Sequence, residues 1–148
     1  MKHKGRTIGI IILCVVAALL VINWQVQPLH RLQQKDAAPD EAYIFSMSVD
    51  GAKSVKLDAQ AIKDLQESAR RGVVLCVGSA QRGYMLEEGP TYDVIISQKS
   101  GDASDILTQL TIDSKGFLNT QHARYHVFGT SWRDAVEKAF QQGEVIDS

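Results

Sequence analysis

A charge-free apolar run near the N-terminus constrains this chain more than any other feature of its sequence. Residues 8–22 contain only Ile, Leu, Val, Ala, Cys and Gly. No polar face interrupts the run, whereas a surface helix of a globular protein normally has one. Extended to residues 7–24, the run gives about 27 Å of helix, close to the thickness of the hydrocarbon core of a bilayer. We therefore predict a transmembrane helix over residues 7–24, with the lipid bilayer as its partner.

The residues on either side of this run predict its orientation. Segment 1–6 contains Lys or Arg at three positions, and basic residues favour the cytoplasmic side of a membrane. Trp24 stands where an interfacial aromatic residue belongs, and Pro28 limits how far the helix can continue. We expect a single-pass protein of the plasma membrane, with a cytoplasmic N-terminus and an extracytoplasmic C-terminal domain.

Two other fates of the N-terminal segment were considered. A cleaved signal peptide needs a small-x-small site just after its apolar centre, but the run ends in Leu-Val-Ile-Asn-Trp. A lipoprotein signal needs a small residue before the modified cysteine, and Cys14 follows Ile-Ile-Leu. An uncleaved signal anchor is the favoured interpretation, and cleavage and lipidation stay open as alternatives.

The charges are divided unevenly along the chain. Residues 1–39 carry five Lys or Arg against one Asp, while residues 40–148 carry 11 against 16 Asp or Glu. An acidic domain is a poor ligand for phosphate backbones, so we expect no nucleic-acid partner. Residues 25–41 are polar, contain two prolines and lack an apolar period, which predicts a flexible stalk. The folded domain is then residues 42–148.

Strands are predicted from period-two alternation and from short apolar runs. Tyr43, Phe45, Met47 and Val49 alternate with Ile44 and two serines, which predicts a half-buried strand that turns at Asp50–Gly51. Residues 73–77 read VVLCV and predict a strand buried on both faces. Further strands are expected in residues 91–98, 105–112, 117–118 and 123–128, with a turn at 113–116 that ends in glycine.

Two helices are predicted from the spacing of apolar residues. Asp58 is the expected N-cap of the first, and Gly72 is expected to end it in a left-handed conformation. The second follows Ser131, presents an apolar face that includes Trp132 and Val136, and ends at Gly143. Neighbouring strands with few helices indicate the α+β class. The predicted architecture is an N-terminal transmembrane helix followed by an antiparallel sheet packed by two amphipathic helices.

A resemblance follows from the sequence of these elements. The helix after Val55-Lys56-Leu57-Asp58, the stretch YDVIIS…DILTQLTIDSKGFL and the final YHVFGTSWRDAVEKAF resemble small extracytoplasmic domains that Gram-positive bacteria attach to their membrane. The resemblance implies a bacterial source and a position outside the plasma membrane. It implies no particular activity and no functional residues.

Reactive groups are sparse in this sequence. Cys14 and Cys76 are expected to be small buried side chains that form no disulfide. His122 and His126 share a face if both lie on one strand, but their α-carbons would then be roughly 13 Å apart, too far to bind one metal ion together. No metal site, cofactor or catalytic group is therefore predicted.

The segment between the strands at 73–77 and 91–98 is the candidate binding site. It is about 14 residues long, which exceeds most hairpin loops. Its central residues, which we predict to contact a partner, are Tyr84, Met85, Leu86, Glu87 and Glu88. Tyr and Met are enriched in binding surfaces. The alternative is that Tyr84 to Leu86 form another strand and are buried.

These observations favour a non-enzymatic function. We expect a membrane-anchored extracytoplasmic domain that binds a protein partner at the cell envelope. Two alternatives stay open. A ligand-sensing domain would need an apolar cavity between sheet and helices, and an envelope enzyme would need a deep pocket with a perturbed acid or histidine.

Overall fold

The structure is a computed structural model, and it describes residues 2–32, 38–80, 89–100, 102–129 and 131–146. The helices are α1 (Lys2–Gln25), the short 3-10 helix η1 (Leu29–Leu32), α2 (Ala59–Arg71) and α3 (Ser131–Gln142). The strands are β1 (Val26–Pro28), β2 (Glu41–Ser48), β3 (Gly51–Lys56), β4 (Val73–Ser79), β5 (Thr91–Ser100), β6 (Ala103–Ile112), β7 (Phe117–Asn119), β8 (Ala123–Phe128) and β9 (Glu144–Val145).

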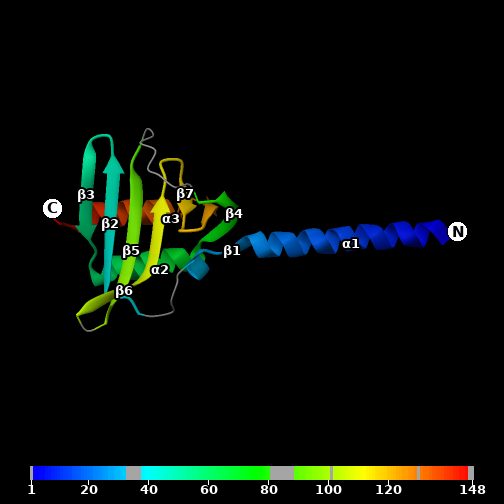
Figure 1. Cartoon of the computed structure of the whole chain (residues 1–148), viewed down its shortest axis with the longest axis horizontal. Coiled ribbons are helices and arrows are strands. Elements are labelled where there is room, and N and C mark those ends of the chain that lie inside the picture. The colour runs from blue at the N-terminus through cyan, green and yellow to red at the C-terminus, as the bar shows by residue number, and fades with distance from the viewer. Residues whose placement is uncertain (1, 33–37, 81–88, 101, 130, 147–148) are drawn as a thin grey trace.

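All nine of these strands form one antiparallel sheet. Their order is β1-β4-β8-β7-β6-β5-β2-β3-β9. Helix α2 connects β3, near one edge, to β4, near the other, and α3 returns from β8 to β9. Both helices cross the same face of the sheet, while α1 projects away from the folded domain (Figure 1). The domain therefore has two layers, with one face of the sheet covered and one open.

The core lies between the sheet and the two crossing helices. Ile44, Val94 and Leu110 are neighbours in register on β2, β5 and β6, and all three are buried. Leu65 of α2 and Val136 of α3 are buried against this layer. The apolar stripes of the two helices are thus covered by alternate residues of the strands, as the period-two and helical patterns require.

Helix α2 begins as the sequence predicts and ends differently. The side chain of Asp58 accepts a hydrogen bond from the backbone N–H of Ala61 at 2.7 Å, which caps the first turn. Gly72 ends the helix, but with φ −75° and ψ 145° it is extended rather than left-handed. A Cβ atom there would lie 3.0 Å from Cδ2 of Leu29, so a larger residue would force the Leu29 side chain to shift.

The predicted α+β fold class is wrong in the proportion of strand to helix. The domain consists mostly of strand, and residues 26–28 and 144–145 add an unpredicted strand at each edge of the sheet. Residues 26–32 lie within the segment expected to be a flexible stalk, yet β1 pairs with β4 and Leu29 is 1% exposed. β4 is buried on one face only, since Val73 and Val77 are exposed.

Helix α1 also differs from its prediction. It forms continuously, and the large apolar side chains between Ile8 and Ile22 are exposed. Within the described residues, no helix meets the length and apolarity that crossing a membrane demands. On this finding, the prediction of a single-pass transmembrane signal anchor over residues 7–24 is wrong.

The contact between Leu29 and Gly72 attaches the first residues after α1 to the domain. We predict that Leu29→Ala lowers the free energy of unfolding by about 2–5 kcal/mol. The substitution removes a fully buried side chain and leaves a cavity that the neighbouring side chains do not fill. Urea denaturation of the full chain measures this value. Val49→Ala, at the exposed tip of the β2–β3 hairpin, is the control, and equal effects of both substitutions would contradict the prediction.

Candidate functional site on the open face of the sheet

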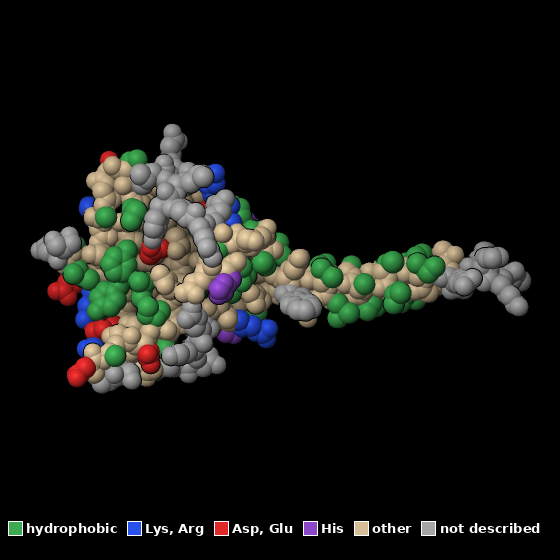
Figure 2. Space-filling model, viewed as in Figure 1, with side chains coloured by type: hydrophobic (Ala, Val, Ile, Leu, Met, Phe, Trp, Pro, Cys, Tyr) green, Lys and Arg blue, Asp and Glu red, His purple; other side chains and the backbone are tan. Residues whose placement is uncertain are grey.

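The open face of the sheet has an apolar patch near the edge formed by β2, β3 and β9. Tyr43, Phe45 and Met47 alternate with the buried Ala42 and Ile44, so they point away from the helices. Phe45 is 42% exposed and Met47 is 37% exposed. Hydrophobic side chains gather on this side of the space-filling view (Figure 2). The more apolar set of residues on β2 is therefore the exposed one.

A shallow hollow of about 450 Å³ lies within this patch. Phe45 and Met47 line it from β2, while Val145 and Ile146 line it from the C-terminal segment. We call these four side chains the open-face patch. Contiguous exposed apolar surface is uncommon on monomeric proteins and commonly marks a site of interaction.

The C-terminal segment is held at this edge by the backbone. The N–H of Ile146 donates to the carbonyl of Ser54 at 3.0 Å, and the Ser54 hydroxyl donates to the carbonyl of Ile146 at 3.2 Å. Gly143 makes the approach possible, because a Cβ atom there would lie 2.8 Å from Val55. The glycine that ends α3 thus also allows Val145 and Ile146 to reach the sheet.

Charged side chains near the open-face patch form ion pairs, in which one glutamate contacts two lysines. Glu41 accepts from Nζ of Lys56 at 3.1 Å and lies 3.2 Å from Nζ of Lys99. The Lys56 ammonium also lies 5.7 Å from the centre of the Tyr43 ring. The hydrogen bond from Lys56, followed by that from Lys99, holds the pKa of Glu41 below its ordinary value. The Thr111 hydroxyl donates to Asp93, which lies beside Phe45 in the register.

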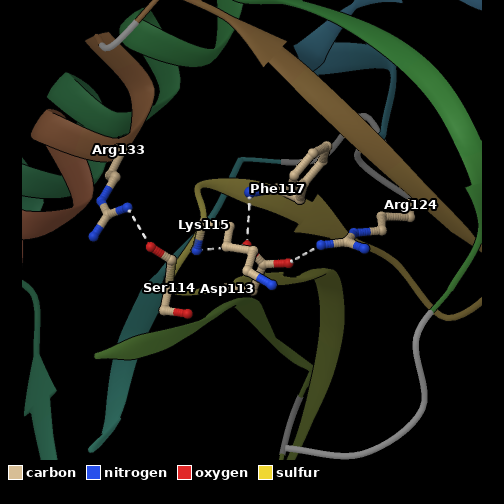
Figure 3. A network of polar contacts seen from close by, with 6 residues as sticks. All are labelled: Asp113, Ser114, Lys115, Phe117, Arg124 and Arg133. Carbon is tan, nitrogen blue, oxygen red and sulfur yellow. Dashed lines mark hydrogen bonds and ion pairs between the residues drawn. The ribbon is translucent and has the colours of Figure 1, made fainter. Parts of the chain in front are cut away.

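A second polar network fixes the turn between β6 and β7. Oδ1 of Asp113 accepts from the backbone N–H groups of Lys115 and Phe117, at 3.0 and 2.8 Å. Its Oδ2 lies 2.7 Å from Nη2 of Arg124, on β8 (Figure 3). Arg124 in turn lies 4.1 Å from the centre of the Phe117 ring. Asp113 therefore serves as a structural acceptor that connects the turn to β8.

The predicted binding residues Tyr84, Met85, Leu86, Glu87 and Glu88 lie outside the described residues. Both interpretations of this segment, exposed loop and buried strand, stay predictions. The residues of the open-face patch were not predicted as a site. Two features of the sequence indicate them. One is the set of apolar residues at the outward-facing positions of β2, and the other is Val145 with Ile146, shortly after Gly143.

The structure places the cysteines and histidines apart from any reactive cluster. Cys14 is exposed on α1 and Cys76 is half-buried, so the expectation that both are buried is wrong. His126 lies edge-on between the rings of Phe117 and Phe128, with centroids 5.7 and 5.2 Å away. His122 is exposed and directly precedes the first residue of β8. Among the side chains described, no three His, Cys, Asp or Glu residues are grouped as metal ligands would be.

A hollow of about 110 Å³ lies between α2 and α3, lined by Ala61, Ala135 and Ala139 among others. It has room for about four water molecules at roughly 30 Å³ each. This hollow is far smaller than the cavities of about 300 Å³ and more that hold drug-sized ligands. It lies between the two helices and not between the sheet and the helices, so it does not bear on the ligand-sensing alternative.

Comparison with known proteins adds no relative to this description. No family model, no curated protein and no solved structure matches the chain. The resemblance to membrane-attached domains of Gram-positive bacteria stays a prediction based on the order of elements.

We predict that Asp113→Ala lowers the free energy of unfolding by about 1–3 kcal/mol, because it leaves two backbone donors and the partly buried Arg124 without their acceptor. Chemical denaturation measures the change. Asp50→Ala at the exposed β2–β3 turn is the matched control. A loss at Asp113 no larger than at Asp50 would show that the turn is held by its backbone alone.

The ion pairs of Glu41 predict a dependence of stability on pH. Because the pKa of folded Glu41 is lowered, its stabilising contribution is present above its unfolded pKa and is lost as the pH falls through the folded pKa. We expect the thermal midpoint of the native chain to exceed that of Glu41→Gln at neutral pH, with the difference closing in acid. In a Lys56→Met background the difference should be smaller at neutral pH. A difference that is independent of pH would contradict the assignment.

Proposed function

We propose that this chain is a non-enzymatic binding domain whose partner is a protein with an apolar surface. The observation that carries the proposal is the open-face patch of Phe45, Met47, Val145 and Ile146. Protein interfaces place aromatic residues and methionine at their centre and polar groups at their rim. The charged cluster of Glu41, Lys56 and Lys99 supplies such a rim.

The contacts of three described acidic groups support binding rather than acid–base catalysis. Glu41 is held by two lysines, Asp93 accepts from Thr111 and Asp113 accepts from Arg124. A general acid or base needs a pKa near the working pH and a reacting group within hydrogen-bond reach. The pKa of Glu41 is lowered, which moves it further from neutral pH and makes Glu41 a poorer general acid or base.

The cellular context of this binding domain stays a prediction. The contact of residues 7–24 with lipid, the position outside the plasma membrane and the partner in the cell envelope are expectations from the sequence. The open-face patch requires none of them, because an apolar surface of this kind binds a complementary surface in any aqueous compartment.

Photo-crosslinking tests the proposal. A photo-reactive residue at Phe45 should give one discrete protein adduct in cells, whereas the same residue at Lys138, exposed on α3, should not. Adding Met47→Glu should reduce the Phe45 adduct roughly tenfold or more, because it places a charge in the centre of the interface. Circular dichroism of the Met47→Glu chain controls for folding.

Each other outcome of this experiment counts against the proposal. An adduct of twice the mass of the chain would identify a second copy as the occupant. An adduct that persists in the Met47→Glu chain would place the interface elsewhere. The absence of any adduct at Phe45 would leave the open-face patch without a protein partner.

A further inference from the structure

A cluster of basic side chains lies at the root of α1, at the opposite edge of the sheet from the open-face patch. Arg31 is exposed on η1, and Arg70 and Arg71 are exposed in the last turn of α2. Blue side chains are visible beside the point where α1 leaves the domain (Figure 2). We call Arg31, Arg70 and Arg71 the basic root.

The buried contact of Leu29 with Gly72 brings these two segments together. The backbone N–H of Leu29 donates to the carbonyl of Gly72 at 2.9 Å, and the Leu29 side chain lies against the Gly72 α-carbon. Arg31 follows Leu29 by two residues, and Arg70 and Arg71 directly precede Gly72. The cations therefore come from segments about 40 residues apart in the sequence but fixed to each other by the fold.

The charge of the basic root is only partly compensated. Arg71 is paired with Glu67 one turn earlier on α2. Within the described residues, no ion pair involves Arg31 or Arg70. Residues 40–148 as a whole carry five more acidic than basic side chains, so this positive surface stands out against an acidic domain.

The surroundings of the basic root indicate what it binds. It adjoins the end of α1, whose large side chains between Ile8 and Ile22 are apolar and exposed. A partner that covers both regions must combine anionic groups with hydrocarbon. Nucleic acid offers the first without the second, whereas an anionic lipid surface offers both, and each cation near such a surface contributes to attraction.

We propose that the basic root binds the phosphate headgroups of an anionic lipid surface. The inference concerns contact at the surface and does not need a helix that crosses the bilayer. It is also independent of the protein partner proposed for the open-face patch. The attraction sets the orientation of the domain, because the basic root and the open-face patch lie at opposite edges of the sheet. The open-face patch then lies at the edge of the sheet that is farther from the lipid.

Vesicle flotation of the full chain tests the proposal. The measured quantity is the ratio of binding to vesicles of phosphatidylcholine with phosphatidylglycerol over binding to phosphatidylcholine alone. The ratio cancels the apolar contribution of α1, which is common to both vesicles. We expect a ratio of about tenfold or more at low salt, falling as salt is added, since each basic residue contributes about fivefold.

Matched double variants assign the effect to the basic root. Arg31→Gln with Arg70→Gln should lower the ratio several-fold but not to one, because the three basic residues of segment 1–6 still favour the anionic vesicles. Lys53→Gln with Lys138→Gln removes the same charge from other faces and should retain most of the ratio. Arg31→Lys with Arg70→Lys should also retain it, and equal unfolding midpoints control for folding. Equal binding to both vesicles, or equal losses in the two Gln variants, would overturn the proposal. Competition by inorganic phosphate at low millimolar concentration would indicate a discrete anion site and would overturn it as well.

Discussion

Two helices can cover only one face of a nine-stranded antiparallel sheet, and much of this structure follows from that constraint. α2 and α3 each run from one side of the sheet to the other, and together they bury alternate residues of the strands beneath them. The remaining alternate residues face outward. Antiparallel sheets with one open face normally place polar residues there. Here the outward residues of β2 are Tyr43, Phe45 and Met47, so the exposed face keeps an unfavourable contact with water that a partner can relieve.

The same crossing connections bring the two ends of the domain sequence to the two edges of the sheet. β1 follows α1 and pairs with β4 at one edge, and β9 follows α3 and pairs with β3 at the other. Each junction contains a glycine in close contact, since a Cβ atom at Gly143 would clash with Val55 and one at Gly72 would press against Leu29. The basic root and the open-face patch are both built at these junctions. The proposed functional surfaces thus arise where the chain enters and leaves the sheet.

The sequence predicted local structure well where short-range signals decide it. The cap at Asp58 and the apolar faces of both crossing helices are found as expected, and the hairpin turn lies one residue earlier than predicted, at Val49–Asp50. It was less informative where long-range packing decides. Leu29 lies in a polar segment with no period, and only its burial against Gly72 shows that residues 26–32 belong to the domain. On β2 both alternating sets contain apolar residues, so periodicity alone could not show which set faces the helices.

The central claim is that the open-face patch is covered by a partner in the cell, and the accessibility of single cysteines tests it most directly. Phe45→Cys and Val49→Cys would be introduced separately into a chain whose own Cys14 and Cys76 are replaced by serine. Their reaction rates with a water-soluble maleimide would be compared between the purified chain and intact cells made permeable to the reagent. The account predicts that Cys at position 45 reacts readily in the purified chain and is protected in cells, while Cys at position 49 reacts in both. Equal reaction of both positions in cells would contradict it.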